Sequence, residues 1–161
     1  MDTFSPEKRS DIMRRVHSTD TAPEKRVRSL LHKLGFRFRL RRNDLPGKPD
    51  IVLPKHRAVV FVHGCFWHRH QDCPHATTPA SRQEYWLPKF RRIVERDRKN
   101  QAELRRQGWN VIVVWECEVR DLEGLEIRFE KTIHYESLAN QPPDSSSAAM
   151  AAEKHRNYNV Y

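Results

Sequence analysis

The stretch from His63 to Cys73 concentrates the residue types that could do chemistry in this chain. It holds two of the 3 cysteines and three of the 9 histidines, and Phe66 and Trp67 lie side by side within it. Thiolates and imidazoles bind zinc, an imidazole can transfer a proton near neutral pH, and aromatic rings stack on bases. The stretch is therefore a candidate for zinc binding, acid–base catalysis and contact with nucleic acid.

Zinc binding is the first of these possibilities. Cys65, His70 and Cys73 have the spacing C-x4-H-x2-C, which allows all three side chains to converge on one ion. A structural zinc site needs a fourth ligand, usually Cys or His. Cys117, at the end of an expected strand, or His75 would complete the tetrahedron. The alternative is three unrelated thiols, which a folded but zinc-free protein would establish.

A second candidate site lies around Asp50. Asp50 follows Pro49 and should begin one strand while His63 ends the next. A tight turn between antiparallel strands would bring these side chains together, and a carboxylate beside an imidazole can hold a hard cation and a water. His68, on the zinc-fixed loop, would be a general base. Against this, aspartate after proline is common in turns, and His68 could be a zinc ligand or a surface residue.

Three aromatic or apolar residues and one acid have competing interpretations. A small metal loop has little room to bury two large rings, so we expect Phe66 and Trp67 to be an exposed pair that stacks on bases or wedges into a duplex. Core packing is the alternative for this pair. Met13 is a possible second wedge, and core packing is the alternative for it too. Glu24 forms a Thr-x-x-Glu capping box with Thr21, a role that explains it without catalysis.

Hydrophobic periodicity predicts an α/β fold whose mixed central sheet has helices on both faces. A capping box at Ser81 and Glu84 should start the third helix, and Pro88 should break it. Residues 1–137 should form one domain and residues 138–161 a disordered tail. The expected elements are helices from residue 5, over 22–34, from 82 to 107 and over 121–134, and strands over 36–41, 50–53, 58–63 and 109–116.

The charge of the chain indicates a polyanionic partner. The 30 Lys and Arg outnumber the 21 Asp and Glu, which leaves a net charge of +9. A basic surface that serves only solubility is the alternative. An odd number of cysteines argues against a disulfide framework, and the chain has neither a membrane-length apolar run nor a signal-peptide pattern at residue 1 onwards. We therefore expect a cytoplasmic protein.

Short motifs spread over residues 8 to about 120 carry a family resemblance. They are Met13–Arg14, Asp20–Thr21, Glu24–Arg26, Leu45–Asp50, Phe61–His68, Tyr85–Trp86, Val94–Arg98, Gly108–Trp109 and Val114–Cys117. The segments HGCFWH, within Phe61–His68, and VWEC, which is Val114–Cys117, are the most specific. In type and order these motifs resemble those of the very short patch repair (Vsr) DNA mismatch endonucleases.

The resemblance implies a restriction-endonuclease-like core of the PD-(D/E)xK class with a structural zinc loop. It also implies a magnesium-dependent phosphodiesterase, with two catalytic ions, that nicks one strand of duplex DNA. The implied target is the phosphodiester 5′ of the thymine in a T:G mismatch left by deamination of 5-methylcytosine. By position, Asp50 would ligate magnesium, together with the backbone carbonyl of Val62. His63 and His68 would be catalytic, and Glu24 would help hold metal-bound water.

The same resemblance assigns the remaining site residues and the partners. One structural zinc would be held by Cys65, His70, Cys73 and Cys117. Phe66, Trp67 and Met13 would open the base stack beside the mismatch, and Lys89 would enter the minor groove. The partner would be double-stranded DNA with a T:G mismatch, with other mismatch-repair proteins as further candidates, and the enzyme would be a monomer.

The chain departs from the usual nuclease signature at one place and from the family pattern at two. Val62–His63 stands where the nuclease signature has acid-x-lysine, as in the rest of the family. Two residues separate His70 from Cys73 where some members have one, which leaves His75 open as a zinc ligand. Ile93 replaces an expected mismatch-contacting asparagine and cannot hydrogen-bond a guanine edge, so we expect a looser mismatch preference. The alternatives are a related nuclease of another role and a non-catalytic, zinc-stabilised DNA-binding module.

Overall fold

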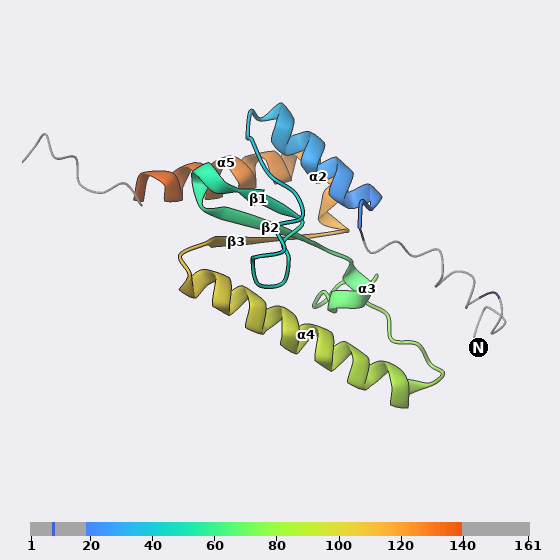
Figure 1. The fold of residues 1–161 in the computed structure, drawn as a ribbon. Coiled ribbons are helices and arrows are strands. Elements are labelled where there is room, and N and C mark those ends of the chain that lie inside the picture. The colour runs from blue at the N-terminus through green and yellow to red at the C-terminus, as the bar shows by residue number, and fades with distance from the viewer. Residues whose placement is uncertain (1–7, 9–18, 140–161) are drawn as a thin grey trace, which may run out of the picture.

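The computed structural model describes residue 8 and residues 19–139 of the 161-residue chain (Figure 1). The helix expected from residue 5, the candidate wedge Met13 and residues 140–161 of the expected tail lie outside the described residues. The elements are α2 (Ala22–Lys33), β1 (Ile51–Leu53), η1 (Pro54–His56), β2 (Ala58–His63), α3 (Cys65–His68), α4 (Gln83–Arg106), β3 (Asn110–Trp115), η2 (Glu118–Arg120) and α5 (Leu122–Ala139). In the described part of the chain, no helix is long and apolar enough to cross a membrane.

The sheet is mixed, as the sequence predicts, and β2 is its central strand. β1 pairs with β2 in the antiparallel sense, with Ile51 opposite Val60. β3 pairs with β2 in the parallel sense, with His63 opposite Trp115. The start of β1 and the carboxyl ends of β2 and β3 therefore meet at one edge of the sheet.

Helices cover both faces of this sheet, which confirms the expected layers. α2 and α5 lie on one face and α4 lies on the other (Figure 1). Because side chains alternate along a strand, Val60 packs with Leu31 and Phe129 in one core cluster, whereas Val59 packs with Leu104 of α4 in the other. The continuous apolar run of β2 follows from this, since both of its faces are covered.

The capping box of α2 forms as expected. The Thr21 side chain accepts a hydrogen bond from the Glu24 backbone, and the Glu24 carboxylate reaches back to the Thr21 backbone. Gly35 follows the helix with φ +82°, a conformation in which a Cβ would be strained. The position of α2 is thus determined locally at both ends.

The expected strand over residues 36–41 does not form. The segment makes a single bridge, in which Arg39 and Val52 exchange backbone hydrogen bonds of 2.8 and 2.9 Å. β1 has only three residues, so it offers little edge for pairing. Burial follows the sequence alternation at Phe36 and Phe38 but fails at Leu40, which is 38% exposed.

α4 also differs from the prediction in two respects. Arg82, in the left-handed conformation, caps the helix without a side-chain bond, so the capping box expected at Ser81 and Glu84 is wrong. The helix then runs unbroken through Pro88, where a break was expected. Pro88 and Glu84 are both exposed, so water can bond the Glu84 carbonyl that lacks its helical donor.

Candidate active site and zinc centre

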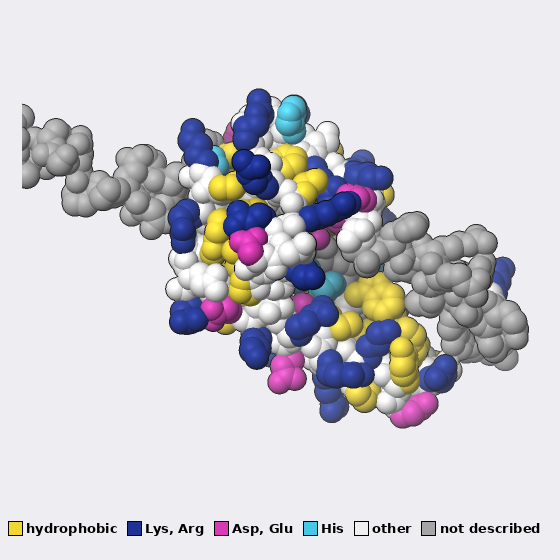
Figure 2. Space-filling view, viewed as in Figure 1, with side chains coloured by type: hydrophobic (Ala, Val, Ile, Leu, Met, Phe, Trp, Pro, Cys, Tyr) yellow, Lys and Arg dark blue, Asp and Glu magenta, His cyan; other side chains and the backbone are white. Residues whose placement is uncertain are grey.

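A cleft of about 490 Å³ opens where β1 begins and β2 ends, against the side of α4. Lys and Arg side chains gather on this face of the molecule around a hollow in which a histidine is visible (Figure 2). Three of the predicted catalytic residues line the cleft. The lining comprises Thr19, Gly47, Lys48, Asp50, Phe61, His63, His68, Arg96, Asp97, Asn100 and Gln101.

Asp50 is held at the floor of this cleft by the strand pairing. The antiparallel register brings it beside β2, where the Val62 N–H donates a 2.7 Å hydrogen bond to Asp50 Oδ2. Burial raises the Asp50 pKa to about 6, against the lowering effect of the Val62 bond, and the charge of Glu24 raises it further. A hard cation would offset the cost of burying the negative charge of this carboxylate, so the site fits oxygen ligation of magnesium.

His68 is oriented by Asp97, a residue to which the sequence analysis assigned no role. His68 Nδ1 lies 2.5 Å from Asp97 Oδ2, although the two residues come from α3 and α4. Burial works to raise the Asp97 pKa, but the bond and the charge of His68 lower it below its usual value. Because an ionised carboxylate only accepts hydrogen bonds, Nδ1 carries the proton and Nε2 is left as a base. Asp97 belongs to the Val94–Arg98 motif, which was the available signal.

The ring of His63 stacks face to face on the ring of His68. The two rings are stacked, with centroids 3.8 Å apart and planes at 11°. Burial, followed by the charge of His68, lowers the His63 pKa to about 4, so its ring is neutral at physiological pH. His63, His68 and Asp97 offer ligand atoms within 4.8 Å of one another. These three side chains therefore form one polar cluster in the cleft, close enough together for proton transfer.

Glu24 is buried beside the cleft but does not line it. Its carboxylate accepts hydrogen bonds from Arg28 at 2.7 Å and from the Asp20 N–H at 3.0 Å, and it also contacts the Thr21 hydroxyl at 2.9 Å. The capping interpretation therefore accounts for its contacts. Its effect on the site is electrostatic, because its charge raises the pKa of Asp50. Its role as an active-site acid remains a prediction, as does the carbonyl ligand from Val62.

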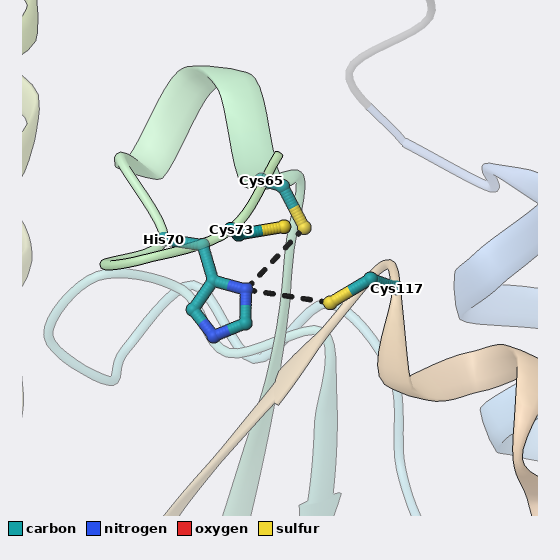
Figure 3. Close-up of side chains that lie close together, drawn as sticks. All are labelled: Cys65, His70, Cys73 and Cys117. Carbon is teal, nitrogen blue, oxygen red and sulfur yellow. Dashed lines mark hydrogen bonds between the residues drawn. The ribbon is translucent and has the colours of Figure 1, made fainter. Parts of the chain in front are cut away.

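The structure brings together the four residues expected to bind zinc (Figure 3). His70 Nδ1 lies 3.3 Å from Cys117 Sγ and 3.7 Å from Cys65 Sγ, and one ligand atom from each of the four lies within 4.8 Å of the others. The parallel pairing of β2 and β3 delivers Cys65 and Cys117 to the same sheet edge. His75 lines a neighbouring cavity but is outside this group. A Cys3His set of this size fits a tetrahedral zinc ion.

Phe66 and Trp67, expected as an exposed pair, are instead only partly exposed, because both rings lie against α4. The Phe66 ring lies 5.6 Å from that of Trp86 and 5.3 Å from that of Phe90, both edge to face. The first turns of α4 thus supply the room that a metal loop alone lacks. Lys89 Nζ lies 5.2 Å from the Trp67 ring centre, which gives this aromatic platform a cationic rim.

Comparison with known proteins agrees with this geometry. The sequence profile of the family described as "DNA mismatch endonuclease Vsr" matches residues 1–75. The type II nicking enzyme V.XorIIP of Xanthomonas oryzae pv. oryzae is 52% identical over 82% of this chain and 96% of its own length. The DNA mismatch endonuclease Vsr of Escherichia coli is 48% identical over 73% of this chain and 74% of its own. The chain belongs to the Vsr family of DNA mismatch endonucleases.

A solved structure supports the fold of this Vsr-family chain. The catalytic domain of the homing endonuclease I-Bth0305I superposes with a TM-score of 0.52 at 18% identity, covering 73% of this chain and 98% of that one. The likeness confirms the restriction-endonuclease-like architecture expected from the sequence. The family makes this protein a DNA endonuclease, a hydrolase.

The pairing of Asp97 with His68 leads to a first testable prediction for this Vsr-family enzyme. Asp97→Asn should lower the single-turnover nicking rate about 100-fold, because a neutral amide neither holds the Nδ1–H tautomer as firmly nor stabilises the imidazolium. Glu95→Gln, which removes the same charge from an exposed position of α4, is the matched control. Equal rates for the two variants would contradict the role assigned to Asp97.

Proposed function

We propose that the protein nicks one strand of duplex DNA on the 5′ side of the thymine in a T:G mismatch, as in the repair of deaminated 5-methylcytosine. The observation that carries this proposal is that Asp50 and the Asp97-bound His68 face one cleft. The names of the relatives, a mismatch endonuclease and a nicking enzyme, support the substrate and the single-strand cut. One chain supplies all of these groups, so a single copy would suffice for a single-strand cut.

In this mechanism His68 Nε2 takes a proton from the water that attacks the phosphorus, or assists the leaving oxygen through a second water. Asp97 accepts the hydrogen bond from Nδ1 throughout and stabilises the imidazolium that results. The neutral ring of His63 covers one face of His68 and keeps it in plane. Asp50 and the Val62 carbonyl would hold magnesium, which supplies positive charge for the attacking and leaving oxygens.

Recognition would begin at the aromatic platform formed by Phe66, Trp67, Trp86 and Phe90. Trp67 and Phe66 are partly exposed and stand next to His68 on α3, so an unstacked base pair would lie close to the catalytic groups. A T:G step is easier to unstack than a matched one, so wedging itself favours the mismatch. Lys89, at the rim, would contact the DNA backbone or minor groove without reading sequence.

A panel of end-labelled duplexes that differ only at one base pair tests this function. With magnesium, the protein should nick the T:G duplex faster than its matched T:A counterpart and leave the opposite strand intact. Equal nicking of matched and mismatched duplexes would defeat the mismatch assignment and leave the endonuclease assignment standing. Cutting of both strands would favour the alternative of a related nuclease with another role.

Ile93 gives a second prediction on the same panel. It is partly buried on α4, one turn from Lys89 and one turn from Asp97, so it lies between the platform and the cleft. Ile93→Asn should raise the ratio of T:G to T:A nicking rates about tenfold, because an amide can hydrogen-bond a base edge that an alkyl group cannot. An unchanged ratio would show that this position does not set mismatch preference.

A further inference from the structure

Lys48 stands in the catalytic cleft without a role in any step above. It lines the cleft beside Asp50, and its side chain is exposed. In the described part of the chain, Lys48 Nζ has neither a hydrogen bond nor an ion pair. An ammonium group that the fold itself does not use, next to the groups of a phosphodiesterase, is available to the substrate.

The backbone at Lys48 has a positive φ, a conformation that costs a lysine more than a glycine. Its φ is +50°, in the left-handed region where glycine is favoured because it has no Cβ. No local hydrogen bond of the side chain compensates, as can occur with asparagine or aspartate. Glycine would fit this backbone better, and six other described non-glycine residues share the conformation. It is the place of Lys48 in the cleft that points to a function of its side chain.

The loop that carries Lys48 is held firmly, so its ammonium group has a defined reach. Leu45 and Pro49 are buried on either side of it, and the Lys48 N–H donates to the Leu45 carbonyl at 3.1 Å. Gly47 lies so close to α4 that a Cβ there would come within 3.0 Å of Asn100. The loop is therefore held between the sheet and α4, with the Lys48 side chain exposed.

Cationic side chains line the cleft from two different elements. Asp50 and Asp97 are the carboxylates within it, Lys48 lies on the loop side, and Arg96 lies on the α4 side. Arg96 is 63% exposed and makes one bond, of 3.3 Å, to Asp97. β2 has no lysine between Ala58 and His63. The ammonium group of the cleft therefore comes from the loop that precedes β1.

We propose that Lys48 is a further catalytic residue, which binds a non-bridging oxygen of the scissile phosphate and stabilises the charge that develops there. The proposal rests on the proposed phosphodiesterase function and adds a substrate contact to it. A lysine ammonium is a compact charge that can follow the phosphate as its geometry changes, and such donors act at the transition state more than in binding. Lys48→Gln should therefore lower the single-turnover nicking rate roughly 10- to 100-fold.

Lys55→Gln is the matched control for this experiment. Lys55 is exposed on η1, at the end of the sheet away from the cleft, and its loss changes the net charge equally. Lys48→Arg should restore most of the rate, because it restores the cation. Rates of Lys48→Gln and Lys55→Gln within twofold of each other, or no rescue by Lys48→Arg, would overturn the proposal.

Two further measurements separate this proposal from a structural role and from the proposed function. Lys48→Gly should unfold at the same or a higher temperature than the wild type while losing the same rate, because it relieves the left-handed strain. Salt titrations of duplex binding without magnesium should show a slope smaller by about one for Lys48→Gln, but not for Lys55→Gln. Equal slopes for the two variants would contradict the role of Lys48, whether or not the wild type nicks. A wild type that does not nick would instead contradict the proposed function.

Discussion

A chain with Asp50→Asn should bind a T:G duplex and leave it uncut. The expected loss in single-turnover rate with magnesium is roughly 1000-fold or more, equal to about 4 kcal/mol of transition-state stabilisation. The amide oxygen can still accept the 2.7 Å hydrogen bond from the Val62 N–H, so the local fold is kept. Only the negative charge that would hold the cation is removed.

The same variant should be at least as stable as the wild type. Burial, opposed by the Val62 bond and aided by the charge of Glu24, raises the Asp50 pKa from 3.8 to about 6, so ionised Asp50 destabilises the fold at neutral pH. The folded state binds the proton more tightly, and the wild type recovers this stability as the pH falls from 6 towards 3.8. In metal-free buffer, the advantage of Asp50→Asn should therefore shrink over that range.

These two readouts make the test decisive for the enzyme interpretation. An inactive Asp50→Asn chain that unfolds at or above the wild-type temperature locates the defect in the chemistry. A variant that nicks as fast as the wild type would remove Asp50 from the mechanism. It would also favour the alternative in which a nuclease fold is kept as a zinc-stabilised DNA-binding module.

The second large effect is expected at the zinc centre, where Cys117→Ala should lose both the metal and the activity. The wild type should contain about one zinc per chain, because four ligand atoms converge within 4.8 Å. These ligands tie the end of β3 to the loop around α3, which carries His68 (Figure 3). Structural zinc contributes on the order of 10 kcal/mol in small domains, so we expect a large fall in unfolding temperature.

His75→Ala is the matched control, and metal analysis is the measurement. His75 lines the same cavity as Cys117 but lies outside the group of four, so its loss should leave the zinc content and the unfolding temperature unchanged. Zinc retained by Cys117→Ala and lost by His75→Ala would identify His75 as the fourth ligand. A wild-type chain that is folded and active without zinc would refute the zinc centre altogether.

Much of the architecture could be predicted because its causes are local. The Thr21 capping box and Gly35 determine α2 within one stretch of chain. The apolar run from Ala58 to His63 identifies a strand covered on both faces. Local signals also misled where tertiary contacts outweighed them. Residues 36–41 form only one bridge because β1, their partner, is short. Pro88 does not break α4 because it lies on an exposed face of that helix.

By itself, the sequence determined which residue types the site contains and that Cys65, His70 and Cys73 lie close enough in the chain to share an ion. Only the tertiary structure decided their partners. Cys117 joins them because β2 and β3 are parallel neighbours, a pairing between segments about fifty residues apart. Asp97 meets His68 because α4 packs across the sheet beside α3. Such contacts depend on register and layer packing, which distant parts of the chain set together, and no short motif contains that information.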